Sequence, residues 1–118
     1  MSDFEVYKDS DNTVTGTIID ADEAAVDITA ATITWSVLKK GASFDGDLDT
    51  VAAGGSIVKA TGGSGVAISD GTAGEYEVTI GDTDTSALPV EEYYVLIRCT
   101  LAGGSTPPIP RQTMNLTV

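Results

Sequence analysis

The chain has 118 residues, of which eighteen are acidic, six are basic, one is cysteine and none is histidine, so its formal net charge is −12. This length suits a single domain, residues 1–118, with a core that needs no metal or disulfide. The charge opposes direct binding to nucleic acid, which depends on lysine and arginine. A single cysteine excludes an internal disulfide, and with no histidine it also excludes Cys–His catalysis and a tetrahedral zinc site.

Neither a secretory signal nor a membrane span is recognisable in the sequence. The first residues, Met-Ser-Asp-Phe-Glu, lack a basic region followed by an apolar run. No apolar stretch is long enough to cross a bilayer. We therefore expect a soluble protein that is synthesised in a cytoplasm.

The chain begins with two expected strands, residues 4–7 and 13–19, separated by a polar turn. The second strand is rich in β-branched residues, and Gly16 marks a bulge or a close approach within it. Residues 20–27 are short of apolar periodicity, so a loop or one helical turn is expected there.

Residues 31–39 form the clearest strand of the sequence, because large apolar and small polar side chains alternate along them. Trp35 is the largest apolar side chain available, and we expect it in the middle of the core. An exposed loop is predicted for residues 39–55, followed by short strands at 56–60 and 66–68.

A strand, a corner and a second strand dominate the C-terminal half. Residues 74–80 and 93–99 both alternate apolar and polar side chains, which places Cys99 on an apolar face as a buried hydrophobe. The corner at 82–88 is typical of a capped helical turn. Residues 113–118 complete the series as a final strand.

Seven to eight short strands with evenly spaced turn signals predict an all-β protein. The two strands around the 82–88 corner need a second sheet to cover their apolar face. The fold class expected is an immunoglobulin-like antiparallel β-sandwich, with a small jelly roll as the other architecture of this kind.

Carboxylates are plentiful in the chain. Asp45, Asp47 and Asp49 alternate in a glycine-containing loop, which is the pattern that a calcium ion prefers, although the spacing departs from that of an EF-hand. The competing interpretation is that these side chains are solvated and cap turns. Nothing marks a buried carboxylate pair, and the glycine-rich stretches are typical of turns, so we expect no enzymatic activity and no catalytic residue.

The strand–corner–strand unit resembles a known pattern. Ala-Gly-Glu-Tyr-Glu-Val-Thr-Ile (73–80), Asp-Thr-Asp-Thr-Ser-Ala-Leu (82–88) and Tyr-Tyr-Val-Leu-Ile-Arg (93–98), with a Gly-Gly turn after them, are similar to the second half of an immunoglobulin-like domain of tailed-bacteriophage virion proteins. Residues 15–20 and 27–37 resemble its first half. Such domains occur in upper-baseplate proteins and in related tail or head accessory proteins.

The resemblance implies a function rather than a set of site residues. One departure is Glu92, which stands where the family usually has glycine before the second tyrosine. The family implies a non-enzymatic structural protein of the virion that docks on the capsid, neck or tail and stabilises or decorates it. Its partners are then other virion proteins, and it is present in many symmetry-related copies.

Two exposed segments are predicted to contact such partners, because apolar groups on exposed loops are best explained by binding. The candidate contact residues in these segments are Phe44, Leu48, Pro107, Pro108 and Ile109. A free sheet edge is a further candidate for contact.

The alternative function is recognition of host-surface carbohydrate, with calcium held by Asp45, Asp47 and Asp49. Sugar sites usually stack rings on exposed aromatic side chains. After the aromatic residues assigned to the core, the chain leaves Phe4, Tyr7, Phe44 and Tyr94 for this role. A bacterial surface or adhesin domain is a third reading, against which the lack of a signal peptide weighs.

Overall fold

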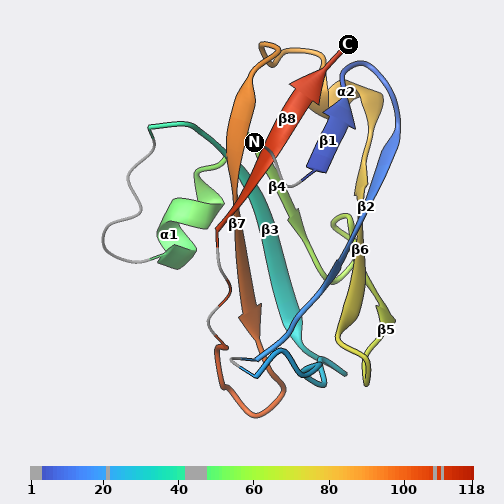
Figure 1. The fold of residues 1–118 in the computed structure, drawn as a ribbon, viewed down its shortest axis with the longest axis vertical. Helices are drawn as coiled ribbons and strands as arrows, with labels where there is room; N and C mark the ends of the chain where they lie inside the picture. Colours follow the sequence, from blue (N-terminus) through green and yellow to red (C-terminus); the bar gives the residue numbers. More distant parts are fainter. Residues whose placement is uncertain (1–3, 21, 42–47, 108, 110) are drawn as a thin grey trace.

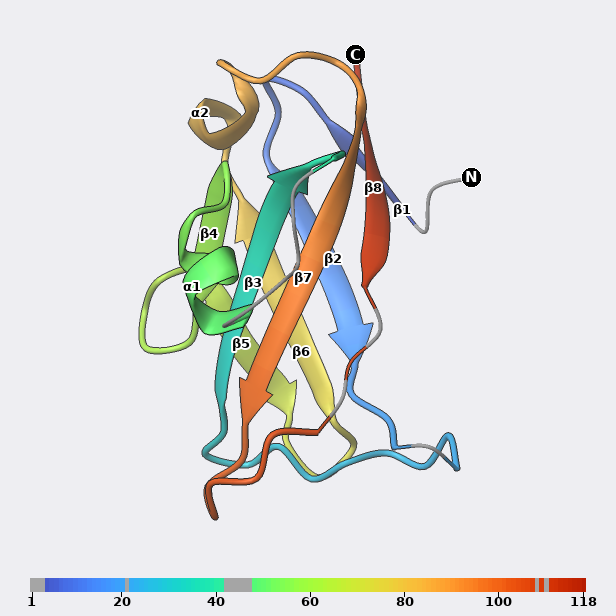
Figure 2. The ribbon, with the colours of Figure 1, turned by 90° about the vertical axis from the view of Figure 1, so that its left-hand side faces the viewer.

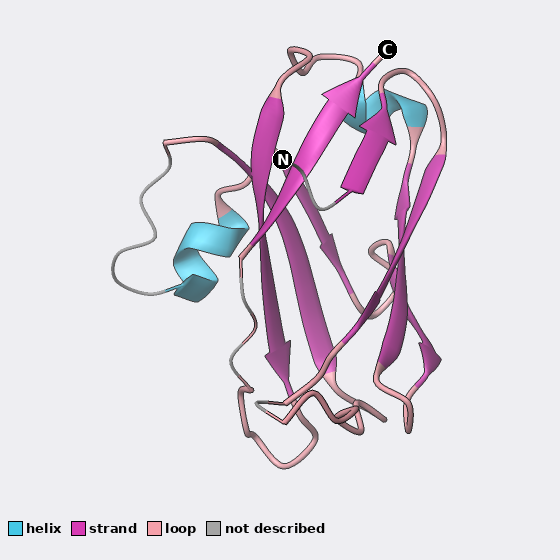
Figure 3. Cartoon of the chain, in the orientation of Figure 1, coloured by secondary structure: helices cyan, strands magenta, loops and turns pink. Residues whose placement is uncertain are grey.

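The computed structural model describes residues 4–20, 22–41, 48–107, 109 and 111–118, and in these the chain forms eight strands and two short helices (Figures 1 and 3). The elements in chain order are β1 (Phe4–Tyr7), β2 (Asn12–Thr17), β3 (Thr32–Lys39), α1 (Leu48–Ala53), β4 (Ile57–Ala60), β5 (Val66–Asp70), β6 (Glu75–Ile80), α2 (Asp82–Thr85), β7 (Glu92–Thr100) and β8 (Gln112–Thr117).

The strands form two sheets that face each other across a common core (Figure 2). Five strands form one sheet in the order β1-β8-β7-β3-β4, and three strands form the other in the order β2-β6-β5. The predominance of β structure and the number of strands confirm the expectation from the sequence.

The expectation of purely antiparallel pairing is wrong for β1, which pairs in parallel with β8, with Phe4 beside Met114 and Tyr7 beside Thr117. The five-stranded sheet is therefore mixed. The physical reason is the connectivity: the chain leaves β1 for β2 in the opposite sheet, so no hairpin fixes the direction of β1 within its own sheet.

Alternating side chains from both sheets build the core. Along β6 every second residue is buried, and Trp35 of β3 is fully buried, as the sequence predicts. Its ring lies 6.1 Å from that of Phe4, centroid to centroid. Tyr93 and Cys99 of β7 are buried in the same core, and burial raises the pKa of the Cys99 thiol. Cys99 is therefore an inert core residue.

Gly16 of β2 is a close-approach site rather than a bulge. It pairs with Tyr76 of β6, and a Cβ at position 16 would overlap the phenol ring. The ring lies over the glycine, and burial raises the pKa of Tyr76 to about 12. The glycine is needed here for space, not for an unusual backbone angle.

The exposed loop predicted for residues 39–55 is wrong in part, because residues 48–53 form α1. This helix packs on the outer face of the five-stranded sheet, where Leu38, Ala52 and Leu96 are buried together. The Ser36 hydroxyl donates a hydrogen bond to the carbonyl of Ala52 at 2.6 Å. The helix has six residues and is followed by two glycines, so it is too short to give a readable helical period in the sequence.

The corner between β6 and β7 contains α2, as predicted. Asp84 accepts a hydrogen bond from the Gly81 N–H at 2.7 Å, which satisfies a donor at the start of the helix. The Tyr93 hydroxyl donates to the carbonyl of Pro89 at 2.7 Å and so ties the start of β7 to the corner. Within the described ranges, no helix is long and apolar enough to cross a membrane.

Candidate interaction surface

The residues predicted to contact a partner or to bind a metal fall into three groups. Phe44, Asp45, Asp47 and Pro108 lie outside the described residues. Leu48 and Asp49 are the first two residues of α1, and of these only the backbone is described. Pro107 and Ile109 are half-buried in the connection between β7 and β8, where Ile109 packs against the main core.

Helix α1 and the end of the β7–β8 connection flank Tyr94, which lies on the outer face of β7. On one side, Val51 of α1 and the Tyr94 ring pack against the same small cluster of buried residues. On the other side, Arg111 lies at the end of the β7–β8 connection, with its guanidinium carbon 3.9 Å from the centroid of the Tyr94 ring. The fold thus brings Val51 and Arg111, which are about 60 residues apart in the sequence, to the same tyrosine.

A second cation completes this group, which we call the Tyr94 surface: Lys40, Glu92, Tyr94 and Arg111. The Lys40 ammonium lies 5.8 Å from the ring centroid and forms an ion pair with Glu92. The hydrogen bond to Glu92 raises the pKa of Lys40. Aromatic rings attract cations at these distances, so Tyr94 holds two positive side chains next to an apolar cluster.

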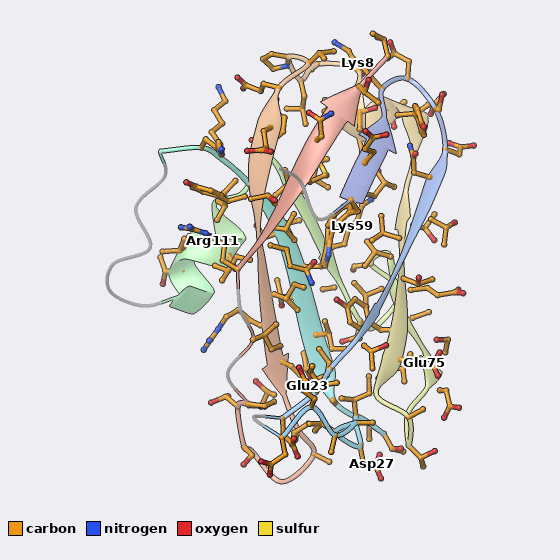
Figure 4. All side chains as sticks on the ribbon, in the orientation of Figure 1. Lys8, Glu23, Asp27, Lys59, Glu75 and Arg111 are labelled. Atoms are coloured by element: carbon orange, nitrogen blue, oxygen red, sulfur yellow. The ribbon has the colours of Figure 1, made fainter. Side chains whose placement is uncertain are left out.

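Charge is distributed unevenly between the two sheets. Four of the six basic residues, namely Lys39, Lys40, Arg98 and Arg111, lie on or immediately beside β3, β7 and β8. The strands β2, β5 and β6 contain no basic residue. The charged side chains within the strands of the three-stranded sheet are therefore all acidic, and Figure 4 shows Glu75 of this sheet on the opposite side of the view from Arg111.

Several of the described carboxylates serve turns and caps. Asp20 accepts hydrogen bonds from the backbone N–H groups of Asp22 and Ala24, at 2.9 and 3.0 Å. Hydrogen bonds from the Thr29 side chain and backbone lower the pKa of Asp27. These are the uses expected for acidic side chains in loops.

Asp84 links two elements of the fold. Its oxygen lies 2.7 Å from the Lys59 ammonium, in an ion pair that links α2 to β4. Burial by itself would raise the pKa of Asp84, but the hydrogen bonds from Lys59 and from the Gly81 N–H outweigh it, so the pKa lies below its ordinary value. The carboxylate is thus held in its charged form.

Among the residues that the structure describes, no group of three or more cysteine, aspartate or glutamate side chains has the arrangement to hold a metal ion. Since Asp45 and Asp47 lie outside these residues and the Asp49 side chain is not described, the calcium site stays a prediction.

Several large apolar side chains are exposed, and the sequence patterns do not single them out. The most exposed within the body of the chain are Tyr7 (51%) and Val90 (49%), followed by Ile19 (43%) and Val58 (41%). Strand alternation does place Tyr7 opposite to the buried Val6, and Val90 lies between a proline and a glutamate in the corner. These local patterns are only weak indications that Tyr7 and Val90 are exposed.

No protein-family model matches the chain, and no curated protein matches it at a significant level.

Proposed function

We propose that the chain is an immunoglobulin-like structural protein of a tailed-phage virion, which docks on the capsid, neck or tail in many symmetry-related copies and has no enzymatic activity. The observation that carries this proposal is the β6–α2–β7 unit. The residues that resemble the virion domains form this unit, which supplies the middle strand of each sheet.

Three features support the immunoglobulin-like architecture. The sheets β1-β8-β7-β3-β4 and β2-β6-β5 have the strand neighbours of such a sandwich. The Tyr93 hydroxyl bonds back to the Pro89 carbonyl four residues upstream, at the corner before β7. Immunoglobulin-like domains have a tyrosine with this bond at the same corner. Trp35 occupies the third strand, where these domains bury a tryptophan, and the chain holds it without a disulfide.

Docking through side chains is supported over docking through strand addition. Edge strands are often blunted by short length, bulges or inward-pointing charges. In β5 the register shifts between Ile68 and Asp70, and in β4 the Lys59 side chain turns towards Asp84. The backbone N–H and carbonyl of Tyr7, at the end of β1, bond to the side-chain amide of Asn12. These features blunt the edges at β5, β4 and β1 and favour docking through the faces and ends of the sheets.

The carbohydrate-binding alternative receives less support from the aromatic side chains. A stacked sugar needs an open ring face, and Arg111 covers one face of Tyr94. Phe4 is half-buried against Trp35. Tyr7 is the one described aromatic side chain that is mostly exposed. This alternative predicts calcium-dependent binding to a polysaccharide, which separates it from the virion proposal.

Co-sedimentation tests the proposal. The purified chain is mixed with intact particles and with empty capsids of the phage whose genome encodes it, with and without calcium. We expect saturable binding without calcium, at a copy number set by the symmetry of the head or tail. Failure to bind either particle, together with calcium-dependent binding to host-surface polysaccharide, would replace the proposal with the alternative.

A further inference from the structure

One end of the molecule carries an exposed apolar group that the Tyr94 surface does not include. The end of β1, the end of β8 and the corner before β7 meet there: the Lys8 N–H bonds to the Thr117 carbonyl at 2.7 Å, and the Leu116 N–H bonds to the Glu91 carbonyl at 3.0 Å. Figures 1 and 2 both show α2, the end of β1 and the C-terminus at this end. We call Tyr7, Pro89 and Val90 the tip surface.

The tip surface is held on a fixed backbone. The Lys8 ammonium donates to the Leu88 carbonyl at 2.7 Å, and the Tyr93 hydroxyl donates to the Pro89 carbonyl at 2.7 Å. Leu88 itself packs against the main core. The segment that presents Val90 is therefore anchored from both sides.

The other half of the tip surface is fixed in a similar way. The Tyr7 N–H donates to Asn12 Oδ1 at 3.0 Å, and Asn12 Nδ2 donates to the Tyr7 carbonyl at 2.9 Å. Binding to a surface that is already ordered costs less conformational entropy than binding to a mobile loop. Large apolar side chains that are both exposed and ordered are a feature of interaction sites.

Around the tip surface, three exposed acidic side chains outnumber the one basic side chain, the partly buried Lys8. Glu5 precedes Tyr7 by two residues on the same face of β1, Asp9 lies two residues beyond it, and Glu91 follows Val90; all three are exposed. In a symmetric pair of copies these rims would meet like against like, and each copy has a net charge of −12. Charge complementarity favours a basic rim on the other side of the contact.

We propose that the tip surface is the docking site of the chain, and that its partner is a protein surface with an apolar centre rimmed by lysine or arginine. This inference rests on the proposed function, because it names the surface and the partner chemistry through which a virion protein docks.

The test compares two double variants in the co-sedimentation experiment. Y7S/V90S removes the apolar side chains of the tip surface, and I19S/V58S removes two side chains of similar exposure elsewhere. We expect the tip variant to lose at least about tenfold in affinity and the control to stay within about twofold of the unmodified chain. Urea unfolding of both variants checks that each remains folded.

The rim is tested separately with E5Q/E91Q. Added salt should weaken binding of the unmodified chain, and it should weaken binding of E5Q/E91Q less, because two of the screened charges are gone. Binding that is insensitive to salt would overturn the basic rim of the partner. If the isolated chain forms dimers and Y7S/V90S does not, the partner is a second copy of the chain. That result would also overturn the proposal of a partner with a basic rim.

The remaining outcomes separate this inference from the proposed function. If the unmodified chain binds particles and Y7S/V90S binds equally well, the tip surface is not the docking site, although the virion function stands. If the unmodified chain binds no particle, the proposed function fails, and the inference fails with it.

Discussion

The outer faces of the two sheets are built differently, although both start from the same alternation of apolar and polar residues. On the five-stranded sheet, α1 covers β3 and β7, so Ser36, Leu38 and Leu96 are buried on the side that faces away from the core. On the three-stranded sheet, Glu75, Glu77 and Thr79 of β6 stay exposed. The first sheet is thus packed on both faces at its centre, and the second on one face only.

The difference shows what a six-residue helix contributes. It converts the outer face of β3 and β7 from a solvated surface into a second, small core that supports Tyr94. If this small core stabilises the fold, substitutions in it should lower the free energy of unfolding. Substitutions on the outer face of the three-stranded sheet should leave that free energy almost unchanged.

The largest effect is expected for Leu96→Ala, on the outer face of β7. Leu96 is 4% exposed beneath α1, so its truncation should lower the free energy of unfolding by about 2–5 kcal/mol. Glu77→Ala on the outer face of β6 is the matched control and should change it by less than about 0.5 kcal/mol. Urea unfolding at neutral pH measures both, and equal effects of the two would show that α1 builds no core.

Ser36→Ala tests the polar bond inside the same small core. Without the hydroxyl, the buried carbonyl of Ala52 loses one hydrogen bond and keeps the one from the Gly55 N–H, so a loss of about 0.5–1.5 kcal/mol is expected. Thr15→Ala, on the exposed side of β2, serves as the control. Faster hydrogen exchange in residues 50–53 of the Ser36 variant would locate the effect in α1, and unchanged stability would contradict it.

Asp84→Asn tests the ion pair that links α2 to β4. A loss of about 1 kcal/mol is expected at neutral pH, from a weakened cap and a partly exposed ion pair. Because the folded-state pKa of Asp84 is lowered, its contribution is fully present above the unfolded-state pKa and is lost as pH falls through the folded-state pKa. The gap between the unmodified chain and the variant should therefore narrow in acid. If the difference in free energy of unfolding between the two proteins does not change with pH, the loss arises from packing rather than from the charge of Asp84.

The smallest effect is expected for Arg111→Ala on the Tyr94 surface. Cation–π contacts at exposed sites contribute about 0.5–1 kcal/mol, so unfolding should shift only slightly. Arg111→Lys keeps the charge without the planar group and should recover part of the loss. A loss as large as that of Leu96→Ala would place Arg111 in the small core rather than on its rim.

Sequence periodicity was sufficient to locate the strands, because alternation of apolar and polar residues identifies which side chains of a strand are buried. It located β3, β6 and β7 and placed Trp35, Tyr76 and Tyr93 in the core. It failed for α1, where six residues span less than two helical turns and leave no period to read. The parallel pairing of β1 was also missed, because pairing direction depends on contacts between strands more than 100 residues apart.

The candidate surfaces were less accessible to prediction than the fold. The Tyr94 surface joins Lys40, Glu92 and Arg111, and nothing local in the sequence places these charges beside one ring. The tip surface depends on Asn12 and Lys8, whose hydrogen bonds are visible only in three dimensions. The order and pairing of the strands decide which side chains meet on one surface. No single segment of the sequence contains that information.

The parallel pairing of β1 with β8 has a mechanical consequence. If tension is applied through residues 4 and 117, the two strands are pulled in opposite directions along their length, because they run side by side in the same sense. The four paired positions from Phe4 to Tyr7 then bear the load together in shear, whereas strands of a hairpin that are peeled from one end yield one pair at a time. Forced unfolding depends on the unfolding rate, and this geometry makes the first step a concerted rupture. A chain tethered at both of these positions would therefore resist stretching at the edge of its five-stranded sheet.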